Sequence, residues 1–175
     1  MSLNEKKVLM VIAANNFRDE EYAEPRKVLE KAGVRVTVAC STLNTAKGKL
    51  GLEVEPDVLI SNVKEADYDG IVFVGGGGAQ EYFESPVAHK LARNFYGHGK
   101  LTSAICIAPA ILANAGLLKA KKATSFPSSR ETLQTKGAVF TGTGVESDGL
   151  IVTGSGPEAA TKFGEKLVEV LGGKQ

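Results

Sequence analysis

The stretch TSAICIAPAIL, residues 102–112, runs through apolar residues into a cysteine, Cys106, and continues at once in a pattern typical of a helix. A strand that ends in a reactive side chain and turns directly into a helix is a nucleophile elbow. Backbone amides and the positive end of the helix dipole then lie beside the sulfur, and both favour the thiolate. The stretch predicts a reactive Cys106 whose thiol pKa lies below its usual value of about 8.5. The alternative is a buried cysteine that packs in the core, since cysteine is among the most frequently buried residues.

Length and composition indicate one domain, residues 1–175, with a polar segment at about residues 1–6 that we expect to be flexible. The 21 Lys and Arg residues nearly balance the 20 Asp and Glu residues, which gives a net charge of +1. This balance argues against a nucleic-acid or membrane partner. The first apolar run, Val8 to Ala14, is too short for a signal peptide or a membrane span, so we expect a cytoplasmic protein.

Short β-branched runs alternate with amphipathic stretches, as in βα units built around a parallel sheet. The sequence therefore predicts an α/β fold. The predicted strands cover residues 8–14, 34–39, 71–74, 102–105, 123–126, 138–141 and 150–153. The predicted helices contain residues 25–32, 86–96, 108–112 and 159–171, and a hairpin or small extra strands are expected around residues 52–54.

The two cysteines, Cys40 and Cys106, are not arranged as a disulfide framework or a zinc site, so no metal is expected. Cys40 continues the apolar face of the strand at residues 34–39 and is expected in the core.

Four successive glycines, residues 75–78, follow the strand at residues 71–74. A glycine turn lets backbone amides approach an anion or an oxyanion closely. The alternative is a tight, flexible turn without a ligand. The spacing matches neither the dinucleotide fingerprint nor the phosphate-binding loop of nucleotide hydrolases, so no cofactor is expected.

Three motifs together resemble the ThiJ/PfpI family of the class I glutamine amidotransferase-like superfamily. They are the glycine turn followed by Ala79 and Gln80, the elbow from Ala104 through Cys106 to Pro109, and Gly154-Ser155-Gly156-Pro157 before the last helix. The resemblance extends from Lys7 to about Leu171. It implies a flavodoxin-like three-layer sandwich with helices on both faces of a mainly parallel sheet, and a homodimer or a higher homo-oligomer.

The resemblance also implies roles for individual residues. A glutamate four residues before a proline contacts the elbow cysteine in this family, and Glu21 and Pro25 match those positions. A protonated carboxyl can donate to a thiolate and later carry a proton. The backbone amides of Gly76 and Ile107 match the oxyanion donors, with Gly75 shaping the turn. The alternative for Glu21 is a surface acid that is favoured by the helix dipole.

Two family histidines are missing from this chain. Ile107 follows the cysteine where protease-like members have histidine, and Phe126 takes the place of a second one. The chain's own histidines, His89 and His98, are expected on a solvated helix surface. Acyl transfer from a peptide needs a proton donor for the leaving amine, so a PfpI-type cysteine hydrolase is disfavoured.

Two function classes fit these residues. The first is a cofactor-independent carbonyl-stress enzyme, similar to glyoxalase III or a deglycase, in which the Cys106 thiolate attacks a small reactive carbonyl and Glu21 relays the proton. The second is a redox sensor or stress-response protein that signals through oxidation of Cys106. The sequence favours the enzyme, with Phe17, Tyr22 and Phe126 expected in the walls of its pocket.

Overall fold

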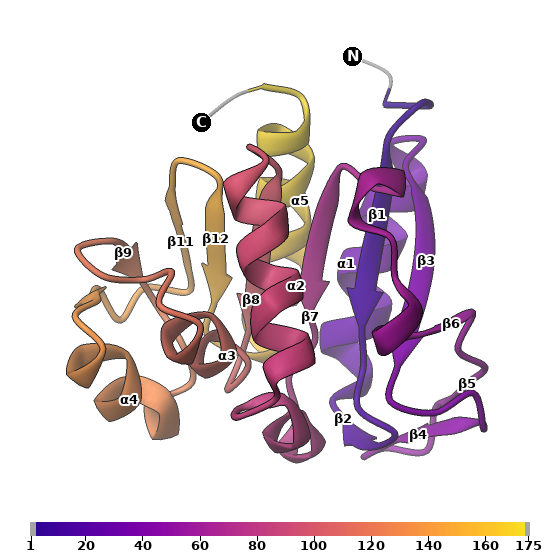
Figure 1. The fold of residues 1–175 in the computed structure, drawn as a ribbon, viewed down its shortest axis with the longest axis horizontal. Coiled ribbons are helices and arrows are strands. Elements are labelled where there is room, and N and C mark those ends of the chain that lie inside the picture. The colour runs from indigo at the N-terminus through magenta and orange to yellow at the C-terminus, as the bar shows by residue number, and fades with distance from the viewer. Residues whose placement is uncertain (1–2, 174–175) are drawn as a thin grey trace.

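A computed structural model describes residues 3–173, which fold around a seven-stranded sheet with the order β11-β12-β8-β7-β1-β3-β6 (Figure 1). Neighbouring strands are parallel except for β11, which runs antiparallel to β12. The strands are β1 (Lys7–Val11), β3 (Arg35–Cys40), β6 (Val58–Leu59), β7 (Gly70–Phe73), β8 (Leu101–Ile105), β11 (Val145–Asp148) and β12 (Ile151–Gly154). The predicted α/β class with a mainly parallel sheet is confirmed.

Helices cover both faces of this sheet. α1 (Asp19–Lys31) and α5 (Ala160–Leu171) lie on one face, and α2 (Pro86–Gly97) and α3 (Pro109–Asn114) lie on the other (Figure 1). Alternate residues of β1 enter two separate apolar clusters, Met10 with α1 and α5, and Leu9 with α2 and α3. This division follows from the two-residue period of a strand. The predicted flavodoxin-like three-layer arrangement is confirmed.

Shorter helical elements lie outside the main layers. They are α4 (Arg130–Thr135) and the 3₁₀ turns η1 (Ile60–Asn62), η2 (Glu65–Asp67), η3 (Gly77–Tyr82), η4 (Pro127–Ser129) and η5 (Pro157–Ala159).

Two small sheets flank the main one. β4 (Ala46–Gly48) and β5 (Glu53–Val54) form the predicted hairpin, and β2 (Asn15–Phe17) pairs with β4. β9 (Lys122–Ala123) pairs only with β10 (Val139–Phe140), outside the central sheet. The four-residue strands predicted at residues 123–126 and 138–141 are therefore too long. Their side chains bond to loops instead, as Thr124 Oγ1 does to the carbonyl of Thr143 at 2.5 Å.

The first strand is also shorter than predicted. β1 ends at Val11, and the chain turns through Ala13 into β2. Of the N-terminal segment predicted to be flexible, residues 1–2 lie outside the described residues. Leu3 is buried, and its amide donates to the carbonyl of Ala32 at 3.2 Å.

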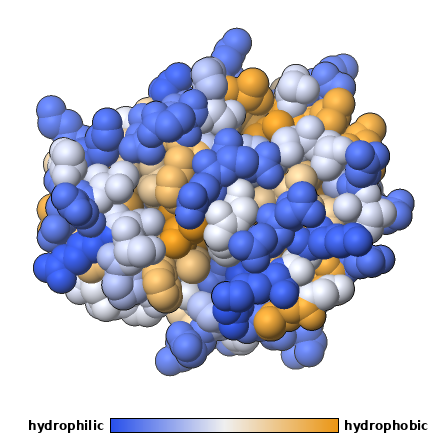
Figure 2. All heavy atoms as spheres, turned by 90° about the horizontal axis from the view of Figure 1, so that it is seen from below, coloured by the Kyte–Doolittle hydropathy of each residue, from blue (hydrophilic) through white to orange (hydrophobic). Residues whose placement is uncertain are grey.

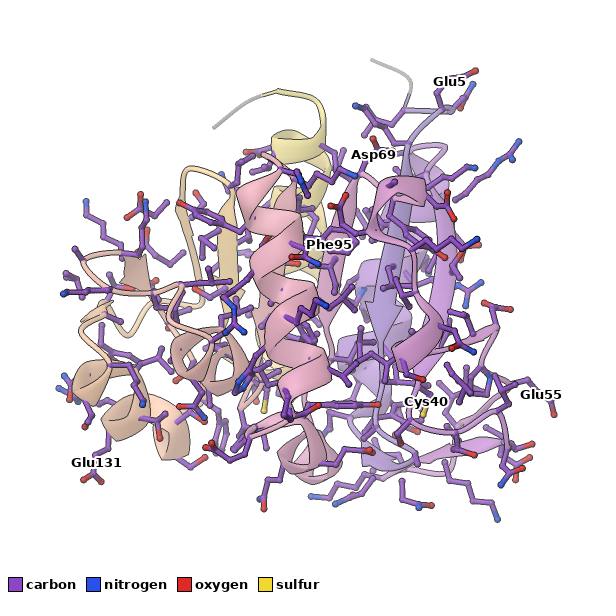
Figure 3. All side chains as sticks on the ribbon, viewed as in Figure 1. Glu5, Cys40, Glu55, Asp69, Phe95 and Glu131 are labelled. Carbon is purple, nitrogen blue, oxygen red and sulfur yellow. The ribbon has the colours of Figure 1, made fainter. Side chains whose placement is uncertain are left out.

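Cys40 is fully buried at the end of β3, in the half of the molecule that carries β3–β6 (Figure 3). Its predicted place in the core is confirmed.

Residues 3–173 contain no helix that is both long and apolar enough to cross a membrane. Within the same range, no group of three or more His, Cys, Asp or Glu side chains is placed to hold a metal ion.

The close contact of α1 with α5 gives a first prediction. A Cβ added at Gly164 would lie 2.9 Å from Pro25 Cα and 3.0 Å from Val28 Cβ, both on α1. Gly164→Ala should therefore lower the free energy of unfolding by about 1–3 kcal/mol, although alanine is the better helix former. Gly97→Ala is the matched control, because no atom lies within 4 Å of that Cβ. It should stabilise the protein by about 0.5–1 kcal/mol in the same urea denaturation experiment. A stabilising Gly164→Ala would contradict the tight packing of these helices.

Candidate active site

Cys106 occupies a strained turn at the carboxyl end of β8. Its φ angle is +66°, a conformation that residues other than glycine rarely adopt. Neighbouring segments hold this turn, since the amide of Cys106 donates to Gly154 at 2.9 Å and its carbonyl accepts from Phe126 at 2.8 Å. β8 ends one residue before the cysteine and α3 begins three residues after it. The predicted elbow is confirmed.

Glu21 lies in the first turns of α1, and its side chain is fully buried. Neither carboxyl oxygen has a hydrogen-bond partner of normal geometry among the described residues. Pro25 has no amide hydrogen and so cannot bond the carbonyl of Glu21 in the usual helical way. A buried carboxyl without partners is costly, so its position calls for a functional explanation.

Gly75 separates Glu21 from Cys106. A Cβ at this position would lie 2.4 Å from Glu21 Oε1 and 2.5 Å from Cys106 Cβ. The absence of a side chain here lets the carboxyl approach the thiol, and no other residue type fits without displacing one of them.

The two acids perturb each other. Burial raises the pKa of Glu21 to about 7, and its contact with the thiol of Cys106 partly opposes the shift. Burial, followed by the charge of the Glu21 carboxylate, raises the pKa of Cys106 to about 12, against the opposing effect of the Gly76 and Ile107 amides. The pair therefore loses its first proton at about pH 7 and shares the remaining proton between about pH 7 and pH 12.

The prediction of a lowered thiol pKa is wrong, because burial alone is the largest cause of the raised value. Two amide donors do not outweigh burial together with a carboxylate next to the sulfur. The following helix, α3, has only six residues and adds little dipole.

The predicted oxyanion donors lie where the resemblance implies. The amides of Gly76 and Ile107 both act on the sulfur of Cys106. Gly76 has a φ angle of +96°, and a Cβ there would lie 2.3 Å from the amide nitrogen of Arg18. The carbonyl of Gly75 accepts from that same amide at 2.9 Å. The structure thus brings together the five predicted site residues, Cys106, Glu21, Gly75, Gly76 and Ile107, while their catalytic roles stay a prediction.

A cavity of about 390 Å³ opens beside these groups. It lies at the end of the sheet viewed in Figure 2, where apolar surface is exposed among hydrophilic side chains. The sequence analysis expected Phe126 in its wall, and this is confirmed. It missed six other lining residues, which are Arg18, Lys49, Gly77, Gln80, Pro157 and Glu158. Phe17 and Tyr22, also expected in the wall, instead pack edge to face in the core with ring centroids 5.8 Å apart.

A larger cavity of about 640 Å³ lies between residues 3–6 and 171–173. Its lining contains no cysteine, histidine or hydroxyl side chain, so we place the chemistry at the Cys106 cavity.

Neither histidine lines the Cys106 cavity. His89 bonds the carbonyl of Phe83 through Nε2 at 2.7 Å, and His98 pairs with Glu65 at the end of α2. Within the described chain, Glu21 is therefore the side chain best placed to exchange a proton with Cys106 or a ligand bound to it.

Comparison with known proteins shows the family of this chain. A model of the DJ-1/PfpI family matches residues 6–170. An uncharacterized protein of Methanocaldococcus jannaschii is 39% identical over 97% of this chain and 84% of its own length. A protein of Pyrococcus horikoshii that is named a deglycase is 28% identical over 93% of this chain and 98% of its own. The crystal structure of a ThiJ/PfpI domain protein from Brachyspira murdochii superimposes with a TM-score of 0.94 at 32% identity, over 99% of both chains.

The buried carboxyl makes stability depend on pH. The pKa of Glu21 is about 7 in the folded protein against 4.5 for a free glutamate, so the folded state holds its proton more tightly. The resulting stabilisation is complete below about pH 4.5 and is lost as the pH rises through about 7. The glutamine in Glu21→Gln does not ionise, so this variant should not lose stability as the pH rises. Its free energy of unfolding should exceed that of the wild type by about 3 kcal/mol at about pH 8 and equal it at about pH 4.

Urea denaturation at both pH values measures this difference. Glu24→Gln, the same change at a partly exposed position of α1, is the matched control. If Glu21→Gln were no more stable than the wild type at the higher pH, Glu21 would not be the costly buried acid described here.

Proposed function

The chain belongs to the DJ-1/PfpI family, and from this we propose that it is a cofactor-independent carbonyl-stress enzyme, similar to glyoxalase III or a deglycase, with Cys106 as nucleophile and Glu21 as proton relay. The observation that carries the proposal is the buried Glu21 carboxyl beside the strained elbow cysteine, with the Cys106 thiol as its polar contact among the described residues. The relative named a deglycase supports the same reaction class.

The first step would be addition of Cys106 to an aldehyde such as that of methylglyoxal. The reactive form of the pair has its shared proton on Glu21 and the negative charge on sulfur. A bond forms between Sγ and the aldehyde carbon, and the π electrons of the carbonyl move to its oxygen. The amides of Gly76 and Ile107 stabilise this oxyanion, and Glu21 then gives it a proton to complete a hemithioacetal.

The second step would move hydrogen between the two carbonyl carbons. The Glu21 carboxylate removes the proton from the former aldehyde carbon, and the electrons of that C–H bond form the C=C bond of an enediol as the neighbouring oxygen takes up a proton. Glu21 then returns its proton to the neighbouring carbon, and the hydroxyl on the first carbon loses its proton as the C=O bond forms there. The first carbon is oxidised to a thioester, and the second is reduced to an alcohol. Water then cleaves the thioester, which releases lactate and restores the thiol, so that no external oxidant or reductant is consumed.

The redox-sensor alternative would use the same sulfur, carboxyl and amides. The cavity favours the enzyme, because a volume of about 390 Å³ accommodates a small organic substrate, whereas oxidation by peroxide requires only access to sulfur. The homo-oligomeric assembly stays a prediction that rests on the resemblance. The cytoplasmic location stays a prediction that rests on the short first apolar run of the sequence.

Methylglyoxal turnover tests the proposed reaction. In the absence of glutathione, the wild type should form lactate, and Cys106→Ser should reduce this rate at least about 100-fold, because the hydroxyl is a far weaker nucleophile at neutral pH. Enzymatic assay of lactate measures the product. Cys40→Ala removes the buried cysteine outside the site and should keep the wild-type rate. Lactate formation that persists in Cys106→Ser would contradict the proposal.

The role of Glu21 can be tested through thiol reactivity. In the wild type, the rate of Cys106 alkylation by iodoacetamide should rise with pH through about 7, where the pair loses its first proton. In Glu21→Gln, the first proton lost is that of the buried thiol, so this step should disappear and the rate should rise only at higher pH.

Mass spectrometry of the Cys106 peptide gives the rate at each pH and separates it from any reaction of Cys40. Identical profiles for the wild type and Glu21→Gln would remove Glu21 from the proton transfer.

A further inference from the structure

The tip of the β4–β5 hairpin, residues 49–52, is fixed to the start of α1 by one side chain. Asp19 Oδ1 accepts from the amide of Leu50 at 3.0 Å, and Oδ2 accepts from the amide of Leu52 at 2.9 Å. Gly48 allows this contact, because a Cβ there would lie 2.2 Å from Asp19 Oδ1. Asp19 is only two residues from Glu21, so the hairpin tip is held next to the candidate active site.

The attachment places Lys49 in the wall of the Cys106 cavity. The amide of Lys49 also donates to the carbonyl of Phe17 at 2.8 Å, which fixes its backbone from a second side. Its ammonium group forms no ion pair with a described residue. Lys47, on the same hairpin, does not line the cavity.

Arg18 adds a second cation to this wall. Its Nε and Nη2 atoms each donate to Glu20 at 3.0 Å, which leaves Nη1 without a hydrogen bond among the described residues. The hydrogen bond to Glu20 raises the pKa of Arg18, and the charges of Glu21 and Cys106 raise it further. The guanidinium is therefore close enough to interact electrostatically with Glu21 and Cys106.

Glu158 is the other charged group exposed in the described lining, since Glu21 is fully buried. The accessible part of the cavity therefore carries two cations and one carboxylate. An anionic group on a substrate would be attracted to Lys49 and Arg18, and repelled by Glu158.

We propose that Lys49 and Arg18 bind the carboxylate of an anionic dicarbonyl substrate, and that Asp19 is the positioning residue that holds Lys49 in place. An N–H of Arg18 Nη1 could donate to one oxygen of a carboxylate, and the ammonium group of Lys49 could donate to the other. That the substrate is a dicarbonyl compound rests on the proposed function. The binding of an anion by Lys49 and Arg18 does not depend on it and can be tested without turnover.

Two alkylating reagents test the wall without any catalysis. Iodoacetate carries a carboxylate, and iodoacetamide is its neutral analogue of nearly the same shape. In each case Cys106 sulfur forms a bond to the CH₂ carbon, iodide leaves with the electrons of the C–I bond, and the thiol proton goes to solvent. The measured quantity is the iodoacetate rate divided by the iodoacetamide rate, obtained from the mass of the Cys106 peptide.

Lys49→Met keeps the length of the side chain and removes its charge. It should lower this ratio about fivefold relative to the wild type, as expected for the loss of one nearby charge in a solvated cavity. Lys47→Met makes the same change outside the cavity and should keep the wild-type ratio. Glu158→Gln should raise the ratio, because it removes the opposing carboxylate. Equal ratios in the wild type, Lys49→Met and Lys47→Met would overturn the anion-binding wall.

Asp19→Asn tests the positioning role. It weakens the attachment of the hairpin tip and removes no cation from the wall. It also removes one carboxylate, which by itself would raise the ratio, but Asp19 does not line the cavity, so the displacement of Lys49 should dominate and lower the ratio. Added to Lys49→Met, it should lower the ratio no further, because both changes act through the same ammonium group. A normal ratio in a less stable Asp19→Asn protein would show that Asp19 is only structural.

Turnover separates this inference from the proposed function. Phenylglyoxal and para-carboxyphenylglyoxal differ only in a carboxylate, and the wild type should prefer the charged substrate in kcat/KM by about fivefold, a preference that Lys49→Met should lose. If neither compound is converted but the alkylation ratios behave as expected, the proposed function fails and the anion-binding wall is supported. The opposite result is that both compounds are converted at equal kcat/KM and that the wild type and Lys49→Met have the same alkylation ratio. The anion-binding wall would then be overturned, and the proposed function would be supported.

Discussion

The candidate site depends on a gap that only glycine can leave. Because Gly75 has no Cβ, the Glu21 carboxyl reaches the thiol of Cys106 inside the protein. The other local constraints follow from this contact. α1 must begin where its first turns face the end of β8, and the backbone of Cys106 must adopt a positive φ angle. Hydrogen bonds from neighbouring segments hold both arrangements and so maintain the strained backbone of Cys106.

This contact has a thermodynamic consequence. A buried carboxyl without hydrogen-bond partners lowers the stability of the fold once it ionises, and a neutral side chain of the same shape would avoid this. Sites at which a chain departs from the rules of good packing are often sites of function. Here the departure concerns one acid and one thiol that share a proton, whereas the two apolar clusters on either side of the sheet follow ordinary packing. The cost is therefore local, and the remaining core can offset it.

The sequence predicted the features that depend on local pattern. Long apolar runs identified β1, β7 and β8, and the abrupt change of period at Cys106 identified the elbow. Two-residue strands such as β6 carry too little pattern to be found, and β11 was missed because it is only half-buried. Glu21 was identified only by the family resemblance, because the sequence pattern does not distinguish it from the neighbouring acidic residues at the start of α1. Lys49 was missed because its hairpin is held at the cavity through Asp19, and no local pattern records that contact. Arg18, directly before α1, was missed as well.

The absence of histidine near Cys106 restricts the chemistry that the proposed enzyme can perform. Phe126 lines the cavity at the position where the resemblance led us to expect a second histidine, and Ile107 contributes its amide and not an imidazole. A single carboxyl must therefore give a proton to the oxyanion and later remove one from carbon. One group can do both only if its two protonation states are close in free energy at the working pH, and a pKa of about 7 meets this condition. A free glutamate, almost wholly ionised at neutral pH, would serve the second step and fail the first. The burial that destabilises the fold is thus the same feature that would allow one residue to replace two.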